Sequence, residues 1–425
     1  MKKRKFFKTA IALVMSVALI SGCSSEGSSS SAEESGGEKV IKMWTREASA
    51  ANVQEVVDKF NEEKHGFKIE VTSFPNHSFS DQFAAGLSSN DVPDILSLDL
   101  ILAPYFSSIG ALQDLTDKYE SLSYKDQFID AMDRLGTYED KKYALPFSAD
   151  VSALVYNKQH FKEAGLDPEK PPTTWQEMRE YAKKLTTKDR YGYVFAGADL
   201  GAYAFTFLPF MWGNGGDVFN DDSTKSALKS KEALEALQYY TDLTRKDNVT
   251  PEGVVTYSWA QTQDAFTSGK ASMILTGNFV INTLNKEYPD IDYGVTLIPK
   301  NEGKEHSSFA GGELIAIPNG SKYPEEAWEF IEYALSEEAQ IDVFAKSGTI
   351  PIRTDLFDNQ YFKEEPRYQV FAEALKVGNT PYTTKYTEIF SQPLLNAMQS
   401  ALKGDVTPEE AFKKADKEIN NILSN

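Results

Sequence analysis

Short apolar runs alternate along this chain with segments in which apolar residues recur every three or four positions. Residues 40–44 and 67–71 have the composition of strands. Residues 49–64, between them, place valine or phenylalanine at 53, 56, 57 and 60, on one face of a helix. A further apolar run at 95–98 is expected to be a third strand. This alternation predicts helices packed on a β-sheet, an α/β fold.

The rest of the chain follows the same two patterns. Two strands joined by a short connection, 147–150, are expected at 143–146 and 151–156. Capping-box sequences at Thr174–Glu177 and Thr407–Glu410 predict helix starts. The other expected elements are a helix at 231–244, strands at 272–275, 293–297 and 314–317, and helices over most of the chain from 324 onward.

The strand-rich stretches lie on both sides of a helix-rich middle. A chain that leaves a sheet and later returns to it is expected to form two lobes joined by several crossings. A cleft between such lobes is a preferred place for a ligand.

The first 38 residues follow a different pattern. Basic residues at 2–5 and 8, an apolar core at 11–20 and small residues at 21 and 22 predict an export signal over residues 1–22. The core is too short to span a bilayer stably. Cys23, the only cysteine, follows at once, and this arrangement resembles the bacterial lipobox, which implies that Cys23 is lipidated. The alternatives are a membrane helix or an ordinary signal with an incidental cysteine. Residues 23–38, rich in Ser, Gly and Glu, are expected to be a flexible tether.

Charge and composition narrow the classes of partner. Removal of residues 1–22 removes five basic residues and no acid, which takes the formal net charge from −19 to −24. Such a surface repels phosphate backbones, so we expect no nucleic-acid partner. With no second cysteine the chain cannot form an internal disulfide, and its stability must come from packing.

The sequence shows no pattern of nucleophilic or metal catalysis, whereas paired catalytic carboxylates stay open, because sequence spacing does not reveal how far apart two acids lie in space. The four histidines show no metal-ligand spacing, and no nucleophile elbow, Walker loop or dinucleotide fingerprint is present. We therefore expect no catalytic residue, no metal and no cofactor, and the glycine-rich sequence at 213–216 is expected to be a turn. Asp99 and Asp150 stand out because each adjoins an apolar run, although either could be a helix cap or a turn residue.

Aromatic residues stand at element ends beside polar ones. Trp44 ends the first strand, Trp212 precedes the glycine-rich turn, Trp259 begins a helix, and Phe279 follows Asn278. Any one of them could be a core residue. A sugar, however, needs an aromatic plate for its apolar face and planar polar groups for its hydroxyls, and these residues supply both.

The sequence at 144–158, together with Phe161 and residues 164–166 and 172–177, resembles a signature stretch of bacterial extracellular solute-binding proteins of the maltose-binding type. Shorter pieces of the same pattern recur in order at 92–94, 215–219, 266–273, 277–279, 311–312 and 348–353. The resemblance covers the chain from about residue 39 to its end.

This resemblance implies an α/β, two-lobed periplasmic-binding-protein-like fold (type II) whose lobes are joined by a hinge and close on the ligand. Residues 39–143 and 271–318 would then form the first lobe. Residues 144–270 and the C-terminal helices, 319–425, would form the second.

The resemblance also implies a set of ligand-binding residues. Asp150 lies where maltose-type proteins have an acid that bonds sugar hydroxyls, whereas Phe279 stands where that group often has a tryptophan. Trp44, Asp99, Trp212, Asn278 and Gly312 lie in segments that resemble those lining the cleft, and Glu313, Arg353, Tyr203 and Tyr382 are further candidates.

From these observations we expect a substrate-binding lipoprotein of an ABC importer that captures an oligosaccharide or a modified sugar. Its partners would be two permease subunits with an ATPase on the cytoplasmic side, and it would be a monomer held on the extracellular face of a cell membrane, as in Gram-positive bacteria. The alternatives are a receptor of the same fold for a polyamine, peptide or organophosphate, and a secreted glycoside-active enzyme.

Overall fold

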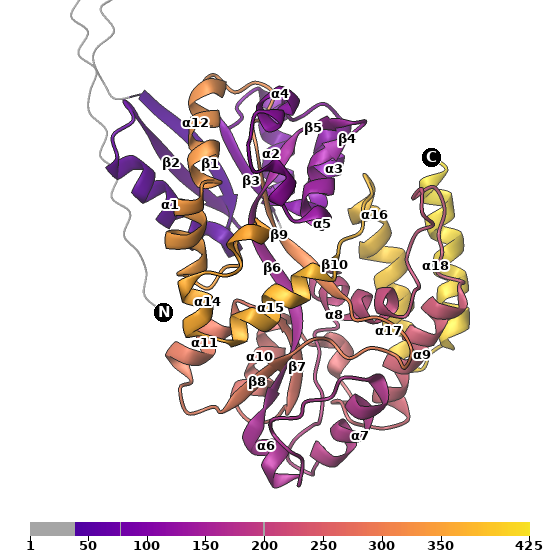
Figure 1. The fold of residues 1–425 in the computed structure, drawn as a ribbon. Helices are drawn as coiled ribbons and strands as arrows, with labels where there is room; N and C mark the ends of the chain where they lie inside the picture. The colour runs from indigo at the N-terminus through magenta and orange to yellow at the C-terminus, as the bar shows by residue number, and fades with distance from the viewer. Residues whose placement is uncertain (1–38, 77, 199) are drawn as a thin grey trace, which may run out of the picture. The chain divides into compact units, whose positions relative to one another are not determined.

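The computed structural model describes residues 39–76, 78–198 and 200–425 (Figure 1). The expected export signal, tether and lipidation site at Cys23 lie outside these residues. Residues Lys39–Asn425 form one compact unit. Within the part of the chain that is described, no helix is both long and apolar enough to cross a membrane.

An eight-stranded sheet runs through the fold in the order β2-β1-β3-β9-β6-β7, with β10 beside β9 and β8 beside β6. Strands β1, β2 and β3 are parallel, whereas β9 is antiparallel to both β3 and β6. The strands are β1 (Lys39–Arg46), β2 (Phe67–Phe74), β3 (Ile95–Asp99), β6 (Ala144–Asn157), β7 (Met273–Gly277), β8 (Tyr293–Thr296), β9 (Ser308–Ala316) and β10 (Gly378–Asn379), with a separate hairpin of β4 (Thr137–Tyr138) and β5 (Lys141–Lys142).

Strand β6 corrects one sequence prediction. It is a single strand of 14 residues, where the sequence predicted two strands and a connection at 147–150. Polar Ser148 and Asp150 interrupt the apolar pattern, but their backbone pairs with β9, opposite Glu313 and Gly311. The register shifts between Pro146 and Ser148, next to a residue that has no N–H to donate. The first half of β6 pairs with β9 and the second with β7 and β8.

Helices cover the sheet (Figure 1). The α-helices are α1 (Ala50–Glu62), α2 (Phe79–Ser89), α3 (Ala103–Ser108), α4 (Thr116–Glu120), α5 (Asp130–Asp133), α6 (Lys158–Glu163), α7 (Trp175–Leu185), α8 (Leu200–Gly213), α9 (Lys231–Arg245), α10 (Trp259–Thr267), α11 (Val280–Glu287), α12 (Pro324–Ala334), α13 (Glu337–Ala339), α14 (Gln360–Glu364), α15 (Arg367–Lys376), α16 (Tyr386–Ile389), α17 (Leu395–Lys403) and α18 (Pro408–Leu423). Shorter 3-10 turns lie at Glu47–Ser49, Leu100–Leu102, Lys125–Gln127, Arg134–Gly136, Val254–Thr256 and Thr354–Leu356, and π-helical turns at Gln340–Ala345 and Phe390–Leu394.

Both predicted capping boxes are present. The Thr174 hydroxyl accepts a hydrogen bond from the Glu177 backbone N–H, and the Glu177 carboxylate accepts one in return. Thr407 and Glu410 do the same at the start of α18. The glycine-rich sequence is a turn, as predicted, since the backbone N–H of Gly215 donates to the carbonyl of Trp212 at the end of α8.

The contacts between elements indicate which expected lobe some of them belong to, although they do not divide the chain into two lobes. Strands β7 and β8 pair with the second half of β6, and α12 contacts α1. The division into lobes stays a prediction. These contacts lead us to propose that β7 and β8 belong with the second lobe and α12 with the first.

Candidate ligand-binding site

A cavity of about 520 Å³ opens where the parallel strands β1 and β3 end, against β6 and β9. Arg46 and Asp99 are the last residues of β1 and β3, and the carboxyl ends of parallel strands are a common place for ligands. Helices α8 and α10 and the segment before α11 contribute further lining residues. Six residues predicted from the sequence line the cavity: Asp99, Asp150, Asn278, Phe279, Gly312 and Glu313.

Arg46 is the centre of the polar wall. Its Nη1 donates to Asp99 Oδ2 at 2.6 Å, its Nε donates to Glu313 Oε1 at 3.0 Å, and its Nη2 also bonds Glu313. The Glu313 carboxylate accepts a further hydrogen bond of 2.9 Å from Ser49 Oγ and is only 2% exposed. Burial raises the pKa of Glu313, and Arg46 opposes that rise. One guanidinium therefore holds two carboxylates together at the junction of β1, β3 and β9.

Asp150 lies in the same wall but is held differently. Gly311, its partner on β9, leaves space for the Asp150 carboxylate, because a Cβ at Gly311 would lie 2.2 Å from Asp150 Oδ1. Burial, together with repulsion by Asp99 and Glu313, raises the pKa of Asp150 to about 7, although attraction by Arg46 opposes the rise. The cavity thus contains a carboxyl group that changes charge near neutral pH.

Aromatic rings line another part of the cavity, the aromatic wall. The rings of Phe205 and Trp259 meet edge to face with centroids 5.6 Å apart, and Trp259 and Phe279 do so at 6.2 Å. Phe309 packs against Phe205 at 5.5 Å. Phe279 is 43% exposed, so part of its ring is free to contact a ligand. The capping box of Ser258 and Gln261 starts α10 directly before Trp259 and so helps to fix this ring.

Asn278 and Gly312 shape the cavity through the backbone. The Asn278 side chain accepts a hydrogen bond from Val151 N–H at 3.1 Å and donates one to the Gly348 carbonyl at 3.0 Å. Its amide therefore joins β6 to the turn at Gly348. Gly312 has a φ of +126°, and a Cβ there would lie 2.0 Å from the Ser148 carbonyl oxygen. Only glycine allows β9 to approach β6 so closely.

The other predicted site residues lie outside this cavity. The Trp44 ring packs on Phe74, and the Trp212 indole N–H donates to Asp217 at 3.0 Å. The remaining three are Tyr203, fully buried and stacked on Phe207; Arg353, paired with Asp355; and Tyr382, whose hydroxyl donates to the Thr137 carbonyl. We therefore leave these five out of the candidate site, because none of them lines the cavity.

Several lining residues were not predicted from the sequence, above all Arg46, Phe205, Gln263, Phe309 and Tyr386. The sequence indicates Trp259 only as an aromatic residue at a helix start. Arg46 carries the one sequence signal that could have been used, a basic residue directly after an apolar strand. Its partners Asp99 and Glu313 lie 53 and 267 positions further along the chain.

A smaller hollow of about 210 Å³ adjoins the cavity. The two share Ile101 and Tyr386, and Tyr105, 45% exposed, lies at the smaller one. Exposed aromatic rings therefore lie at both the cavity, at Phe279, and this hollow, at Tyr105. Together they offer more room than the cavity alone.

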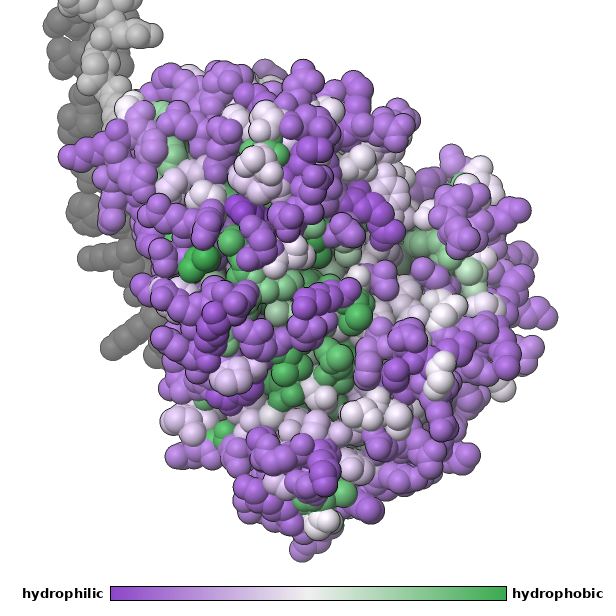
Figure 2. Space-filling model, in the orientation of Figure 1, coloured by the Kyte–Doolittle hydropathy of each residue, from purple (hydrophilic) through white to green (hydrophobic). Residues whose placement is uncertain are grey.

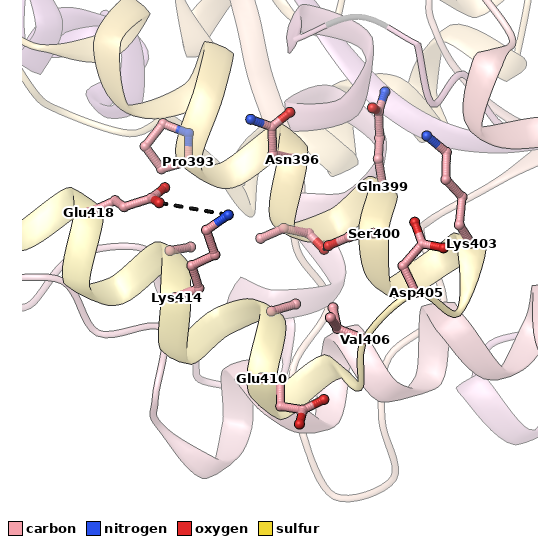
Figure 3. A pocket seen from close by; sticks show the side chains of 13 residues that line it. Pro393, Asn396, Gln399, Ser400, Lys403, Asp405, Val406, Glu410, Lys414 and Glu418 are labelled. Carbon is pink, nitrogen blue, oxygen red and sulfur yellow. Dashed lines mark hydrogen bonds and ion pairs between the residues drawn. The ribbon is translucent and has the colours of Figure 1, made fainter.

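A further hollow lies between α17 and α18 and has a different character (Figure 3). No aromatic ring lines it, and its polar groups are largely engaged locally: Glu410 caps α18, Ser400 bonds the Ala397 carbonyl, and Lys414 pairs with Glu418 at 3.9 Å. The middle of the face in Figure 2, by contrast, gathers hydrophobic side chains between hydrophilic parts. Among the described residues, no cluster of three or more His, Cys, Asp or Glu could hold a metal ion.

The chain is similar to known bacterial binding proteins. Residues 44–341 match a family model described as bacterial extracellular solute-binding protein. A binding protein of Brucella abortus is 26% identical over 388 residues, which cover 90% of this chain and 93% of the relative. The sn-glycerol-3-phosphate-binding periplasmic protein UgpB of Pectobacterium atrosepticum is 23% identical, over 87% of this chain and 88% of that protein.

Two solved structures have a similar fold. An ABC transporter solute-binding protein of Thermotoga lettingae, bound with α-D-tagatose, superposes with a TM-score of 0.80 at 29% identity, over 91% of this chain and all of that one. The cyclic α-maltosyl-1,6-maltose binding protein of Arthrobacter globiformis superposes with a TM-score of 0.79 at 25% identity, over 92% of this chain and all of that one.

Proposed function

This chain belongs to the bacterial extracellular solute-binding protein family, and from that premise we propose that it binds a carbohydrate in the cavity beside Arg46 and Asp150. The family consists of receptors of ABC transporters, so the chain is a receptor and not an enzyme, and it works outside the cytoplasm. The expected α/β periplasmic-binding-protein fold is confirmed.

The pairing of two unlike walls carries this proposal. Phe205, Trp259 and Phe279 offer ring faces and edges to the cavity, and Asp99 and Asp150 offer carboxylate oxygens to the same cavity. A sugar ring has an apolar C–H face and a rim of hydroxyl donors, so it can use both walls at once. The sugars named in the two similar structures agree with this chemistry.

The size of the site favours more than one ring. A cavity of about 520 Å³ lies within the range of small-molecule sites, and the adjoining hollow at Tyr105 extends it. We therefore propose an oligosaccharide or a modified sugar as the ligand.

An organophosphate is the second candidate, because one relative is named for binding sn-glycerol-3-phosphate. The charges in this cavity oppose it. Arg46 is its one basic lining residue among the described residues, and that guanidinium already binds Asp99 and Glu313. A phosphate would meet three carboxyl groups and no free cation, and like charges in a partly buried site repel strongly.

The placement of the receptor is part of the same proposal. Lipidation of Cys23 would hold the protein on the outer face of the membrane. The tether at 23–38 would keep it near two permease subunits with their ATPase, which raises the effective concentration of receptor and permease for each other. The sequence features suit a Gram-positive cell. We propose that the two lobes, as a monomer, close on the ligand because the closed state makes more contacts with it.

A thermal-shift screen against a carbohydrate panel tests the proposal. A ligand that binds only the folded protein stabilises it by mass action, about 2.7 kcal/mol at 100 times Kd. We expect at least one di- or oligosaccharide to raise the melting temperature by several degrees, and sn-glycerol-3-phosphate to leave it unchanged. A shift with sn-glycerol-3-phosphate and with none of the sugars would replace the carbohydrate by the organophosphate.

A further inference from the structure

The charges of the cavity are unbalanced. One cation, Arg46, lies in its wall together with three acids, Asp99, Asp150 and Glu313. We propose that the cavity selects a carbohydrate that carries a primary ammonium group, and that Asp150 binds this group. The inference rests on the proposed carbohydrate function and names the kind of sugar.

Arg46 cannot balance all three acids. Its Nη1 donates to Asp99, and its Nε and Nη2 donate to Glu313. The guanidinium therefore uses Nε, Nη1 and Nη2 for hydrogen bonds within the protein. Its single positive charge balances only one of the two negative charges of Asp99 and Glu313. Arg46 acts on Asp150 only through electrostatic attraction at longer range, without a hydrogen bond.

Two acceptor groups in the wall have no protein partner. The Asp150 side chain makes no hydrogen bond or ion pair with any described residue, although its backbone pairs with β9, and its carboxylate occupies the space that Gly311 leaves open. Tyr386, only 3% exposed, lines the same cavity, and its hydroxyl has no hydrogen-bond partner within the described part of the chain. Buried polar groups such as the Tyr386 hydroxyl are almost always hydrogen-bonded, and the half-buried Asp150 carboxylate lines the cavity without a protein donor, so both indicate where a ligand binds.

An ammonium group supplies the positive charge and the hydrogen-bond donors that the cavity lacks. It carries three N–H donors and one positive charge, whereas a sugar hydroxyl carries one donor and no charge. Hydrogen bonds between a cation and a carboxylate are stronger than those between neutral groups. The aromatic wall of Phe205, Trp259 and Phe279 still requires a ring face on the same ligand, which a linear polyamine lacks.

The titration of Asp150 supports this assignment. Its pKa is raised to about 7 by burial and by repulsion from Asp99 and Glu313, against attraction by Arg46, and these are the charged groups that act on it among the described residues. A bound ammonium group favours the ionised carboxylate and so lowers this pKa again. Uptake of the ligand at about pH 6, where Asp150 still holds its proton and the amine is already charged, should then release a proton.

Matched disaccharides provide the test. We would titrate the β-1,4-linked glucosamine disaccharide, its fully N-acetylated counterpart, maltose and spermidine into the purified protein by calorimetry. We expect the amine to bind at least about tenfold more tightly than its N-acetylated counterpart, a difference of about 1.4 kcal/mol. Repeating the titration in buffers of different ionisation heat should detect proton release for the amine and not for the N-acetylated sugar.

Two variants decide whether Asp150 is responsible. Asp150→Asn should reduce the preference for the amine to less than about threefold. Asp189→Asn, a control at a side chain that is 79% exposed and outside the cavity, should keep the full preference.

Each other outcome overturns the inference. These outcomes are equal affinity for the two disaccharides, binding of maltose without binding of the amine, no binding of the amine, and an unchanged preference in Asp150→Asn. Maltose binding alone would leave the proposed carbohydrate function standing. Binding of spermidine with none of the sugars would overturn both proposals.

Discussion

Replacement of Arg46 by methionine is expected to destabilise the ligand-free protein by about 3–5 kcal/mol at neutral pH, the cost of leaving buried charges without their partner. Without the guanidinium, Glu313 keeps only hydroxyl donors such as Ser49, and Asp99 faces Glu313 across paired strands. Urea unfolding followed by circular dichroism measures this change. A loss below about 1 kcal/mol would contradict the account of Arg46 as the centre of the wall.

The pH dependence of this loss has a definite sign. Burial already raises the pKa of Glu313, and the loss of Arg46 should raise it further. An acid whose pKa is higher in the folded protein than in the unfolded chain costs stability as the pH rises above its unfolded value. The loss in Arg46→Met should therefore shrink as the pH falls below about 4, where Glu313 becomes protonated in the unfolded chain as well as in the folded protein.

Two further variants separate charge from geometry. Arg46→Lys keeps the positive charge but cannot donate to both carboxylates in the same planar arrangement, so its loss should be smaller than that of Arg46→Met. The double variant Arg46→Met/Glu313→Gln removes the unpaired buried charge as well. It should be more stable than Arg46→Met, and equal stabilities would mean that Glu313 is not the source of the cost.

Asp150→Asn is expected to have the opposite effect and to stabilise the ligand-free protein at neutral and alkaline pH. The pKa of Asp150 is about 7 in the folded protein, well above the ordinary range of an aspartate. Between about pH 4 and 7 the folded protein holds a proton that the unfolded chain has lost, so stability falls as the pH rises through this window. Asparagine has no such ionisation. The variant should gain up to about 4 kcal/mol at pH 8 and little at pH 4.

Melting temperatures of the ligand-free protein across this pH range measure the effect. The difference between Asp150→Asn and the wild type should grow from pH 4 to pH 8 and then level off. Asp189→Asn should track the wild type throughout, because that exposed carboxylate is solvated in both states. A difference that does not depend on pH would show that Asp150 is ionised at no cost in the folded protein.

The sequence predicted the parts of this fold that depend on local patterns. Apolar periodicity located the strands around Met43, Ile69 and Val295 and the helix face of Val53 and Phe60, because each pattern is set by neighbours along the chain. The periodicity gave a wrong prediction in β6, where Ser148 and Asp150 interrupt the apolar run. Pairing with β9 satisfies the backbone there whatever the side chains are.

The cavity was predicted in part, for a related reason. Asp99, Asp150, Phe279 and Glu313 were found because they end or adjoin apolar runs or match a family pattern. Arg46 was missed because its role depends on Asp99 and Glu313, which are distant in sequence and become neighbours only when β1, β3 and β9 pair. An ion pair between residues so far apart in the sequence does not change the local composition around either residue.

The central claim, that a carbohydrate stacks on the aromatic wall, is tested most directly by calorimetric titration of the sugar that gives the largest thermal shift. The wild type and Trp259→Ala are compared, with Tyr288→Ala as a control at an exposed ring outside the cavity. We predict binding to the wild type and to Tyr288→Ala with equal affinity, and binding at least about tenfold weaker to Trp259→Ala. Equal affinity of the wild type and Trp259→Ala would contradict the account.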